Sequence, residues 1–239
     1  MLNTIKERGY RFARFDEIPN GNHSAMPIML LRHDIDIDLG KASRMATIEQ
    51  EEGAVATYFF MVRTQHYNLF SREGTTEVEH VLNAGHHFGL HFDCAAYPEN
   101  ETVEQLNEMC NKESEMLEHW FGKPVTIVSY HRPEQIILTG NPALSAPRPH
   151  TYMDRFTKDI FYLSDSRGRW THGTPLECDA LKNRKPMQLL THPIWWDDVP
   201  LPPLETLQAF VARHKDGVEM SLAQNNTVYR VGKYSDVQG

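Results

Sequence analysis

Three aspartates stand at alternate positions in segment 32–38, which reads Arg-His-Asp-Ile-Asp-Ile-Asp. In an extended chain, residues two apart point to the same side, so Asp34 and Asp36 are expected to project together. Neighbouring carboxylates repel each other unless a cation or a proton relieves the repulsion. The pair therefore favours a divalent-metal site, with one carboxylate as ligand and the other as general base. We interpret Asp38 as the N-cap of the following helix.

A second group of candidate ligands lies in segment 85–93, Gly-His-His-Phe-Gly-Leu-His-Phe-Asp. His87, His91 and Asp93 would share one face of an extended strand. Neutral imidazole is the commonest metal ligand among side chains. We interpret His86 and His87, each taken alone, as surface or packing residues. A helical reading of His87 and His91 is weakened by the intervening glycine.

Other apolar runs of the chain also end in ionisable or polar groups. An Arg next to a Pro at such an end presents a fixed donor fork that can orient a carboxylate, although an ordinary surface salt bridge is an equal reading. A His at such an end, beside two tryptophans, suits a general acid in a partly desolvated pocket. The residues concerned are His131, Arg132, Asp165 and His192.

Two tryptophans near these ends are candidates for contact with a sugar. Trp170 follows Asp165 by five residues, and Trp195 follows His192 by three. An aromatic face can stack on a sugar ring, although packing in the core is the commoner role of a single Trp. We expect both side chains to bind substrate.

These residues need a scaffold that brings distant strand ends together. Short apolar runs alternate with stretches of helical periodicity, which is typical of βαβ units and a parallel sheet. In such folds the carboxyl ends of the strands share one rim, where active sites lie. Six runs in 239 residues indicate a doubly wound sheet or a closed barrel, and no glycine-rich phosphate loop supports a dinucleotide fold. The runs are 27–31, 55–62, 87–93, 125–130, 160–163 and 188–190.

The helices between these runs carry recognisable ends. The first is predicted to run from the Asp38 cap to Gly53, and the second from Thr75 or Thr76 to Gly85. Thr102 and Gln105 form a capping-box signal ahead of a long helix. A C-terminal helix is expected around 204–211. Loops are predicted around 19–24 and over 139–152, the latter near the site because long loops are often functional.

The order of the polar motifs resembles the polysaccharide-deacetylase family, also called the NodB-homology or carbohydrate esterase family 4 group. The motifs read HDxD, GHxxGLH, HRP, a segment from Asp165 to Trp170, and LLTHP, and they span 30–196. Within this group the chain resembles a branch found with O-antigen and capsule biosynthesis. The resemblance implies a distorted (β/α)7-type barrel with parallel strands, formed by a single domain over 1–239. It also implies metal-dependent removal of an N-acyl group, expected to be acetyl, from an amino sugar in the synthesis of a surface polysaccharide.

The resemblance also implies roles for individual residues. Asp34 would be the general base and Asp36 and His91 metal ligands. Arg132 would orient the base, and Asp165 would belong to the catalytic set. His192 would be the general acid of the last motif. The metal is a divalent ion, expected to be zinc, which binds three protein ligands and keeps one open position at catalytic sites.

The chain departs from the family pattern at two places. Ile35 separates two aspartates that are usually adjacent, which leaves the division of roles between Asp34 and Asp36 open. Ala95 stands where the family has a second histidine ligand. The third ligand must come from elsewhere, and His131 is preferred because it ends a neighbouring strand. His87 and Asp93 are the alternatives.

The bulk composition is that of an ordinary globular chain. The net charge is -8 and no dense Lys/Arg run is present, so no nucleic-acid partner is expected. No apolar stretch has the length of a membrane span, and no signal peptide is evident at the N-terminus, so a cytoplasmic location is expected without membrane insertion. The three cysteines, Cys94, Cys110 and Cys178, are expected to be reduced thiols.

Two other function classes fit the same residues. One is a metal-dependent amidohydrolase that acts on a cyclic amide or ureide. The other is a barrel that binds sugar without turnover, for which Ala95 is the best support. The sequence leaves open the sugar and its carrier, the metal and the oligomeric state.

Overall fold

The computed structural model describes residues 1–18, 27–98, 102–133 and 135–232. The chain divides into two compact units, Met1–Trp196 and Asp197–Gly239. The strands described below and all the candidate site residues lie in the first unit. A single domain over 1–239 stays a prediction, and the loop expected around 19–24 lies outside the described residues.

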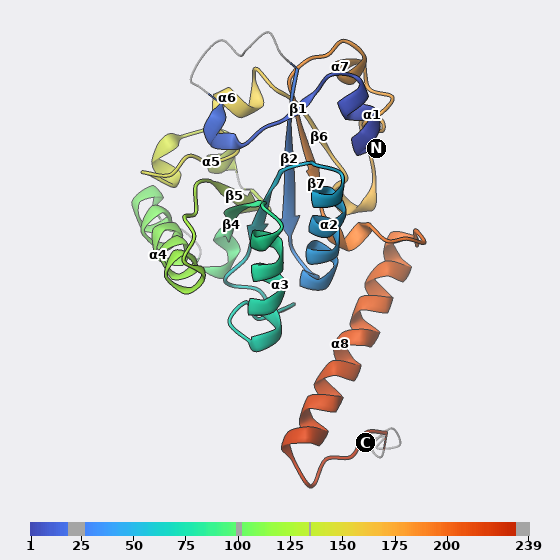
Figure 1. Cartoon of the computed structure of the whole chain (residues 1–239). Coiled ribbons are helices and arrows are strands. Elements are labelled where there is room, and N and C mark those ends of the chain that lie inside the picture. Colours follow the sequence, from blue (N-terminus) through green and yellow to red (C-terminus); the bar gives the residue numbers. More distant parts are fainter. Residues whose placement is uncertain (19–26, 99–101, 134, 233–239) are drawn as a thin grey trace. The chain divides into compact units, whose positions relative to one another are not determined.

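The first unit is built on a sheet of seven parallel strands (Figure 1). The strand order is β5-β4-β3-β2-β7-β6, and β1 also pairs with β2. The sheet curls into a half-barrel, which confirms the predicted α/β class and agrees with a distorted barrel. The strands are β1 (Arg11–Phe12), β2 (Ile28–Ile35), β3 (Ala56–Phe60), β4 (His87–Asp93), β5 (Val128–His131), β6 (Phe161–Ser164) and β7 (Met187–Thr191).

Helices connect the strands. Figure 1 shows α2 and α3 side by side, and the two are in contact. The α-helices of this unit are α1 (Leu2–Glu7), α2 (Leu39–Glu51), α3 (Arg72–Asn83), α4 (Val103–Phe121), α5 (Gln135–Leu138), α6 (Asp154–Thr157) and α7 (Asp179–Lys182). The 3-10 helices are η1 (Phe15–Glu17), η2 (Cys94–Ala96), η3 (Pro142–Leu144), η4 (Ser166–Gly168) and η5 (Pro193–Trp195). The second unit contains α8 (Pro203–Asn225), which is longer than expected.

Most predicted helix starts are confirmed. The Asp38 carboxylate accepts a hydrogen bond from the Lys41 backbone N–H at 3.1 Å, and Thr102 forms the expected capping box at the start of α4. The start of α3 was predicted too late. Ser71 caps it by accepting from the Gly74 backbone N–H at 3.0 Å, about one turn before the predicted start at Thr75.

One side of β2 carries both part of the core and part of the candidate site. Ile28 and Leu30 belong to an apolar cluster with Phe59 of β3, and these side chains are almost fully buried. Arg32 and Asp34 continue on the same side toward the carboxyl end of the strand. The inner side of the sheet thus changes along β2 from apolar packing to charged groups.

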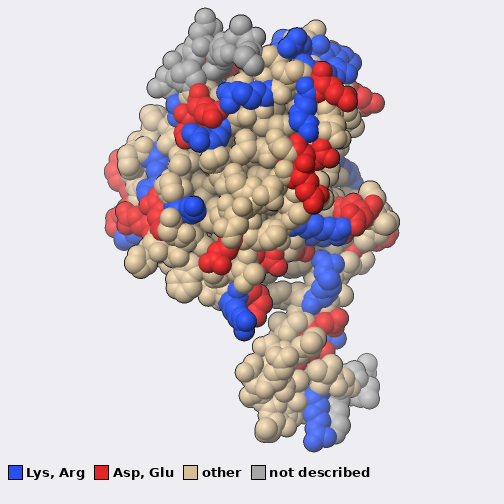
Figure 2. Space-filling model, in the orientation of Figure 1, with Lys and Arg blue, Asp and Glu red and all other residues tan. Residues whose placement is uncertain are grey.

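The surface and the helices add two observations. No helix among the described residues is long and apolar enough to cross a membrane. On the face shown in Figure 2, Lys and Arg side chains are interspersed with Asp and Glu. The cytoplasmic location and the absence of a nucleic-acid partner stay predictions.

Candidate active site

Asp34 is fixed at the end of β2 by Arg32 of the same strand. The Arg32 Nε and Nη2 donate to the two oxygens of Asp34 at 2.9 and 2.7 Å. Both residues are 2% exposed. Burial alone would raise the pKa of Asp34, but the charge and hydrogen bonds of Arg32, together with the nearby His91 and His192, outweigh it and lower the pKa below its ordinary value. Asp34 is therefore an ionised carboxylate in a fixed orientation.

Asp36, His91 and His131 form a compact cluster beside Asp34. The Asp36 Oδ1 lies 3.1 Å from the His91 Nε2 and 3.3 Å from the His131 Nδ1. The two imidazole nitrogens are 3.3 Å apart. Among the described residues, these three are the one group of carboxylates, imidazoles and thiols whose ligand atoms are close enough to share a metal ion. The parallel register of β4 and β5 pairs His91 with Ser129. His131 lies two residues after Ser129 and therefore on the same side of the sheet as His91.

The cluster fits a divalent metal. Zinc bonds of about 2.0–2.1 Å at tetrahedral angles put ligand atoms about 3.3 Å apart, and the three separations are 3.1, 3.3 and 3.3 Å. The Asp36 Oδ1 is buried and has no well-formed hydrogen bond with any described residue. Burial favours the neutral form of Asp36, but the two imidazoles outweigh it and hold its pKa well below the ordinary value. The donor set of one carboxylate and two imidazoles is one that zinc commonly binds.

His192 and Asp165 form a second hydrogen-bonded pair. The His192 Nδ1 lies 2.7 Å from the Asp165 Oδ1, and the Trp196 Nε1–H donates to the Asp165 Oδ2 at 2.8 Å. The backbone N–H of His192 also donates to Asp165 at 3.0 Å. Burial would lower the pKa of His192, but the hydrogen bond with Asp165 and the nearby negative charges of Asp36 and Asp34 together outweigh it and raise the pKa.

The other ring nitrogen of His192 faces the Asp36, His91 and His131 cluster. Its Nε2 lies 3.9 Å from the Asp36 Oδ2. Because the Asp165 carboxylate can only accept, it keeps a proton on the Nδ1. The arrangement is a His oriented by a carboxylate, which is the pattern of a general acid or base.

Arg132 does not lie where the sequence placed it. Its Nη2 donates to the Asp93 Oδ2 at 2.6 Å, and its side chain is 65% exposed. Its φ of 48° is left-handed, which is uncommon outside glycine. The guanidinium that contacts Asp34 belongs to Arg32, and the catalytic role expected of Arg132 stays a prediction. Strand alternation could have found Arg32, because it lies two residues before Asp34.

The reserve ligands lie outside the cluster. Asp93 accepts from Arg132 and from the Ala95 backbone N–H, where it caps η2. His87 is partly buried at the start of β4, and burial lowers its pKa. Of the candidates for the third ligand, the geometry brings His131 to Asp36 and His91. Metal binding by these three stays a prediction.

The tryptophans are arranged differently from the expectation. Trp170 packs edge-on against Trp196, with ring centroids 6.5 Å apart, and Trp196 contacts Asp165. The sequence interpretation chose Trp195, which ends η5 and is half-buried. Trp196 is thus the tryptophan that donates a hydrogen bond to a candidate site residue, Asp165. Substrate contact by Trp170 and Trp195 stays a prediction.

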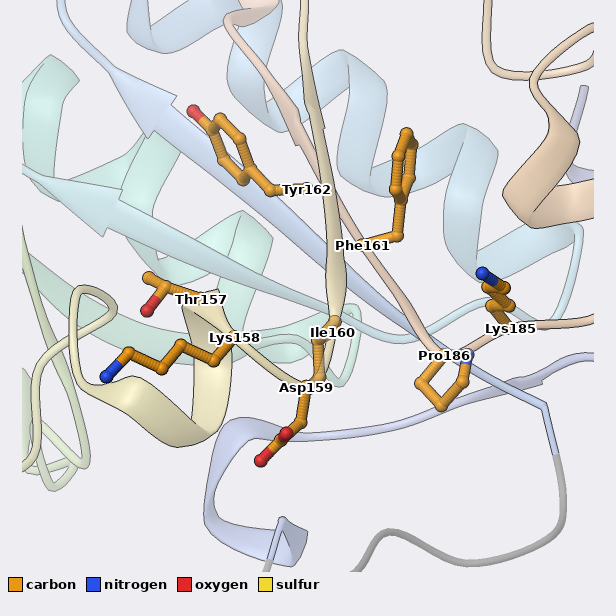
Figure 3. A pocket seen from close by; sticks show the side chains of 8 residues that line it. All are labelled: Thr157, Lys158, Asp159, Ile160, Phe161, Tyr162, Lys185 and Pro186. Atoms are coloured by element: carbon orange, nitrogen blue, oxygen red, sulfur yellow. The ribbon is translucent and has the colours of Figure 1, made fainter.

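A surface pocket lies away from this chemistry. It has a volume of about 350 Å³ and is lined by residues 157–162 with Lys185 and Pro186. These residues surround the amino-terminal ends of β6 and β7, whereas the site residues follow the carboxyl ends. In Figure 3, Phe161 and Tyr162 point to opposite sides of β6. We do not assign the pocket to the candidate site.

Comparisons with known proteins gave matches among solved structures. No family model matches the chain, and no curated protein matches it. A family 4 carbohydrate esterase from Bacillus anthracis is 16% identical, with a TM-score of 0.48, over 90% of this chain and 85% of that one. A CE4 family pseudoenzyme from the same organism is 13% identical, with a TM-score of 0.47, over 82% of this chain.

This chain spans 63% of the pseudoenzyme's length. A family 4 acetyl xylan esterase from Clostridium thermocellum, in complex with a cobalt ion, is 14% identical, with a TM-score of 0.40, over 79% of this chain and 83% of that one. Because these TM-scores are below 0.5, the likenesses carry no argument about activity. The functional argument rests on the site itself.

Proposed function

We propose that this protein is a metal-dependent hydrolase that removes an N-acyl group, acetyl in the first instance, from an amino sugar used in surface-polysaccharide synthesis. The observation that carries the proposal is the triangle of Asp36, His91 and His131, with separations of 3.1, 3.3 and 3.3 Å. An oriented carboxylate, Asp34, and an oriented imidazole, His192, flank it. The order of the sequence motifs supports the choice of an N-acylated amino sugar.

A divalent ion held by Asp36, His91 and His131, for which zinc is our choice, would polarise the amide carbonyl and make water more acidic. Asp34 is the general base, because its ionised carboxylate can accept a proton from the attacking water. Arg32 keeps that carboxylate oriented through two hydrogen bonds. Arg132 donates to Asp93 in this structure.

His192 acts as the general acid. Its Nδ1 is held by Asp165, so its Nε2–H faces the Asp36 side of the site. The raised pKa keeps the ring protonated at a higher pH than an ordinary histidine. It can therefore donate a proton to the departing amine when the C–N bond breaks.

The first test measures metal binding. We expect purified protein to hold about one divalent ion per chain and the Asp36→Ala and His91→Ala variants to lose it. The exposed His172 lies outside the cluster, so His172→Ala is the matched control and should keep the ion. Full metal occupancy in both site variants would contradict the ligand set.

The second test separates binding from turnover. Amine release should be measured on N-acetylated amino sugars and on cyclic ureides, with the parent and with His192→Ala. The proposal expects amine release from the amino sugars only, and a His192→Ala variant that keeps metal but loses turnover. Turnover of the ureides alone would favour the cyclic-amide hydrolase, and sugar binding without amine release would favour a non-catalytic barrel.

A further inference from the structure

Ser129 is a fully buried hydroxyl between the general base and a metal-ligand candidate. It lies on β5 directly opposite His91 of β4 in the parallel register and is 0% exposed. Its Oγ lies 2.6 Å from the His91 Nδ1 and 3.3 Å from the Asp34 Oδ1. The sequence interpretation gave this residue no role.

The donors and acceptors around Ser129 can be assigned from their chemistry. Asp34 is ionised beside Arg32, so it can only accept hydrogen bonds. The single hydroxyl proton of Ser129 is therefore donated to Asp34. The remaining Ser129 lone pairs then accept from the His91 Nδ1–H. The Asp34 Oδ2, which lies 3.7 Å from the His91 Nδ1, also favours a proton on that nitrogen.

We propose that Ser129 is a positioning residue that holds His91 in the tautomer with its proton on Nδ1, so that the Nε2 lone pair faces Asp36 and His131. A ligating imidazole needs that lone pair, and its other nitrogen commonly donates to a fixed acceptor. Here the acceptor is the Ser129 hydroxyl, which donates its own proton to Asp34. One side chain thus orients both the base and a ligand.

The two histidines of the cluster differ in their burial and in the partners of their ring nitrogens. His91 is 2% exposed and has a partner on each ring nitrogen. The His131 side chain is 23% exposed, and its contacts are made through Nδ1 with Asp36 and His91. Ser129 therefore determines the orientation of the buried ligand. This inference deepens the proposed function and rests on its ligand set.

The test uses the full chain with Ser129→Ala, Ser129→Thr and a matched control. Ser114→Ala is the control, because Ser114 is also 0% exposed and its hydroxyl donates to the Cys110 backbone carbonyl at 2.8 Å, within α4. Zn²⁺ affinity is measured by competition with a chelator. The His91 tautomer is read from long-range ¹H–¹⁵N correlation spectra of metal-free protein.

We expect Ser129→Ala to bind Zn²⁺ about 10- to 100-fold more weakly, which is the usual effect of losing such a partner. His91 should then show a mixture of tautomers. Ser129→Thr, which keeps the hydroxyl, and Ser114→Ala should keep the Nδ1–H form. A His91 that stays in the Nδ1–H form in Ser129→Ala, or is in the other tautomer in the parent, would overturn the proposal.

These measurements need no substrate. If the parent shows the Nδ1–H tautomer and Ser129→Ala shifts it, the role of Ser129 stands even when no sugar is deacylated. If the parent binds no Zn²⁺, the proposed function fails, and the tautomer in metal-free protein still decides the role of Ser129.

Discussion

At the scale of single residues, Asp34, the proposed general base, has two buried partners, Arg32 and Ser129, and Arg32 supplies its counter-charge. Arg32 and Asp34 neutralise each other inside the sheet, and the Arg32 guanidinium also lies 5.5 Å from the centre of the Phe59 ring. Removing one member of such a pair leaves an uncompensated buried charge, whereas removing an exposed partner costs little. Arg32 and Arg132 therefore form a natural comparison.

Arg32→Gln is expected to lower the free energy of unfolding by about 3–5 kcal/mol at pH 7, because Asp34 loses its buried counter-charge. Arg132→Gln should change it by about 1 kcal/mol or less, since the Arg132 side chain is mostly exposed. Urea unfolding of both variants checks this difference. Equal losses in the two variants would show that the Arg32 pair is not the dominant interaction of Asp34.

The pH dependence of His192 follows from its hydrogen bond with Asp165 and from the nearby charges of Asp36 and Asp34. Because the folded-state pKa of His192 is raised, its protonated form stabilises the fold below the ordinary pKa of about 6.5, and that stabilisation is lost as the pH rises through the folded pKa. NMR titration of metal-free protein should find the pKa of His192 above its ordinary value and lower in Asp165→Asn than in the parent. An unchanged His192 pKa in Asp165→Asn would remove Asp165 as the cause.

At the scale of elements, the strands that position the site were readable from the sequence because their apolar runs stop at ionisable residues. β2 and β7 were predicted near their true positions, with Asp34, Asp36 and His192 at their ends. Strand alternation also places Arg32 on the same side of β2 as Asp34, two residues away. That Arg132 lies beside Asp93 depends instead on which strands are neighbours and on their register.

Ser129 shows the same limit. Nothing local distinguishes it from other serines, and its position opposite His91 follows from the pairing of β4 with β5. The start of α3 was missed for a different reason, since the Ser71 cap lies about two turns before the first buried apolar side chain, Val78. Local signals thus predict elements better than partners.

Gly89 of β4 is required by close packing between neighbouring strands. A Cβ at this position would lie 2.4 Å from the Phe59 Cδ1. Gly89→Ala is therefore expected to lower the free energy of unfolding by about 1–3 kcal/mol through overpacking. Gly89 lies two residues before His91 on the same side of β4, so the Zn²⁺ affinity of the Gly89→Ala variant should fall as well.

Gly40→Ala is the matched control. Gly40 lies in the first turn of α2, and a Cβ there would contact only the Asp38 side chain, at an ordinary 3.5 Å. Alanine is the better helix former, so this change should leave stability equal or raise it by up to about 1 kcal/mol. Thermal unfolding of both variants decides the matter. A Gly89→Ala variant as stable as the parent would mean that the Phe59 ring can move aside without cost.

At the scale of the whole molecule, the division into two units can be tested against the expectation of one domain. Every residue of the candidate site lies in Met1–Trp196. In the second unit, apolar side chains of α8 such as Val211 and Met220 are 64% and 57% exposed. An isolated helix is marginally stable in water, so α8 contributes little stability through its own backbone.

A chain that ends at Asp198 is therefore expected to fold cooperatively and to bind Zn²⁺ within about threefold of the full chain, which corresponds to about 0.65 kcal/mol. Thermal unfolding and chelator competition on both chains check this. The first unit keeps its sheet, its apolar inner cluster and the Asp36, His91 and His131 cluster. A truncated chain that fails to fold would instead support a single domain over 1–239, and one that folds but loses Zn²⁺ affinity would show that the second unit completes the site.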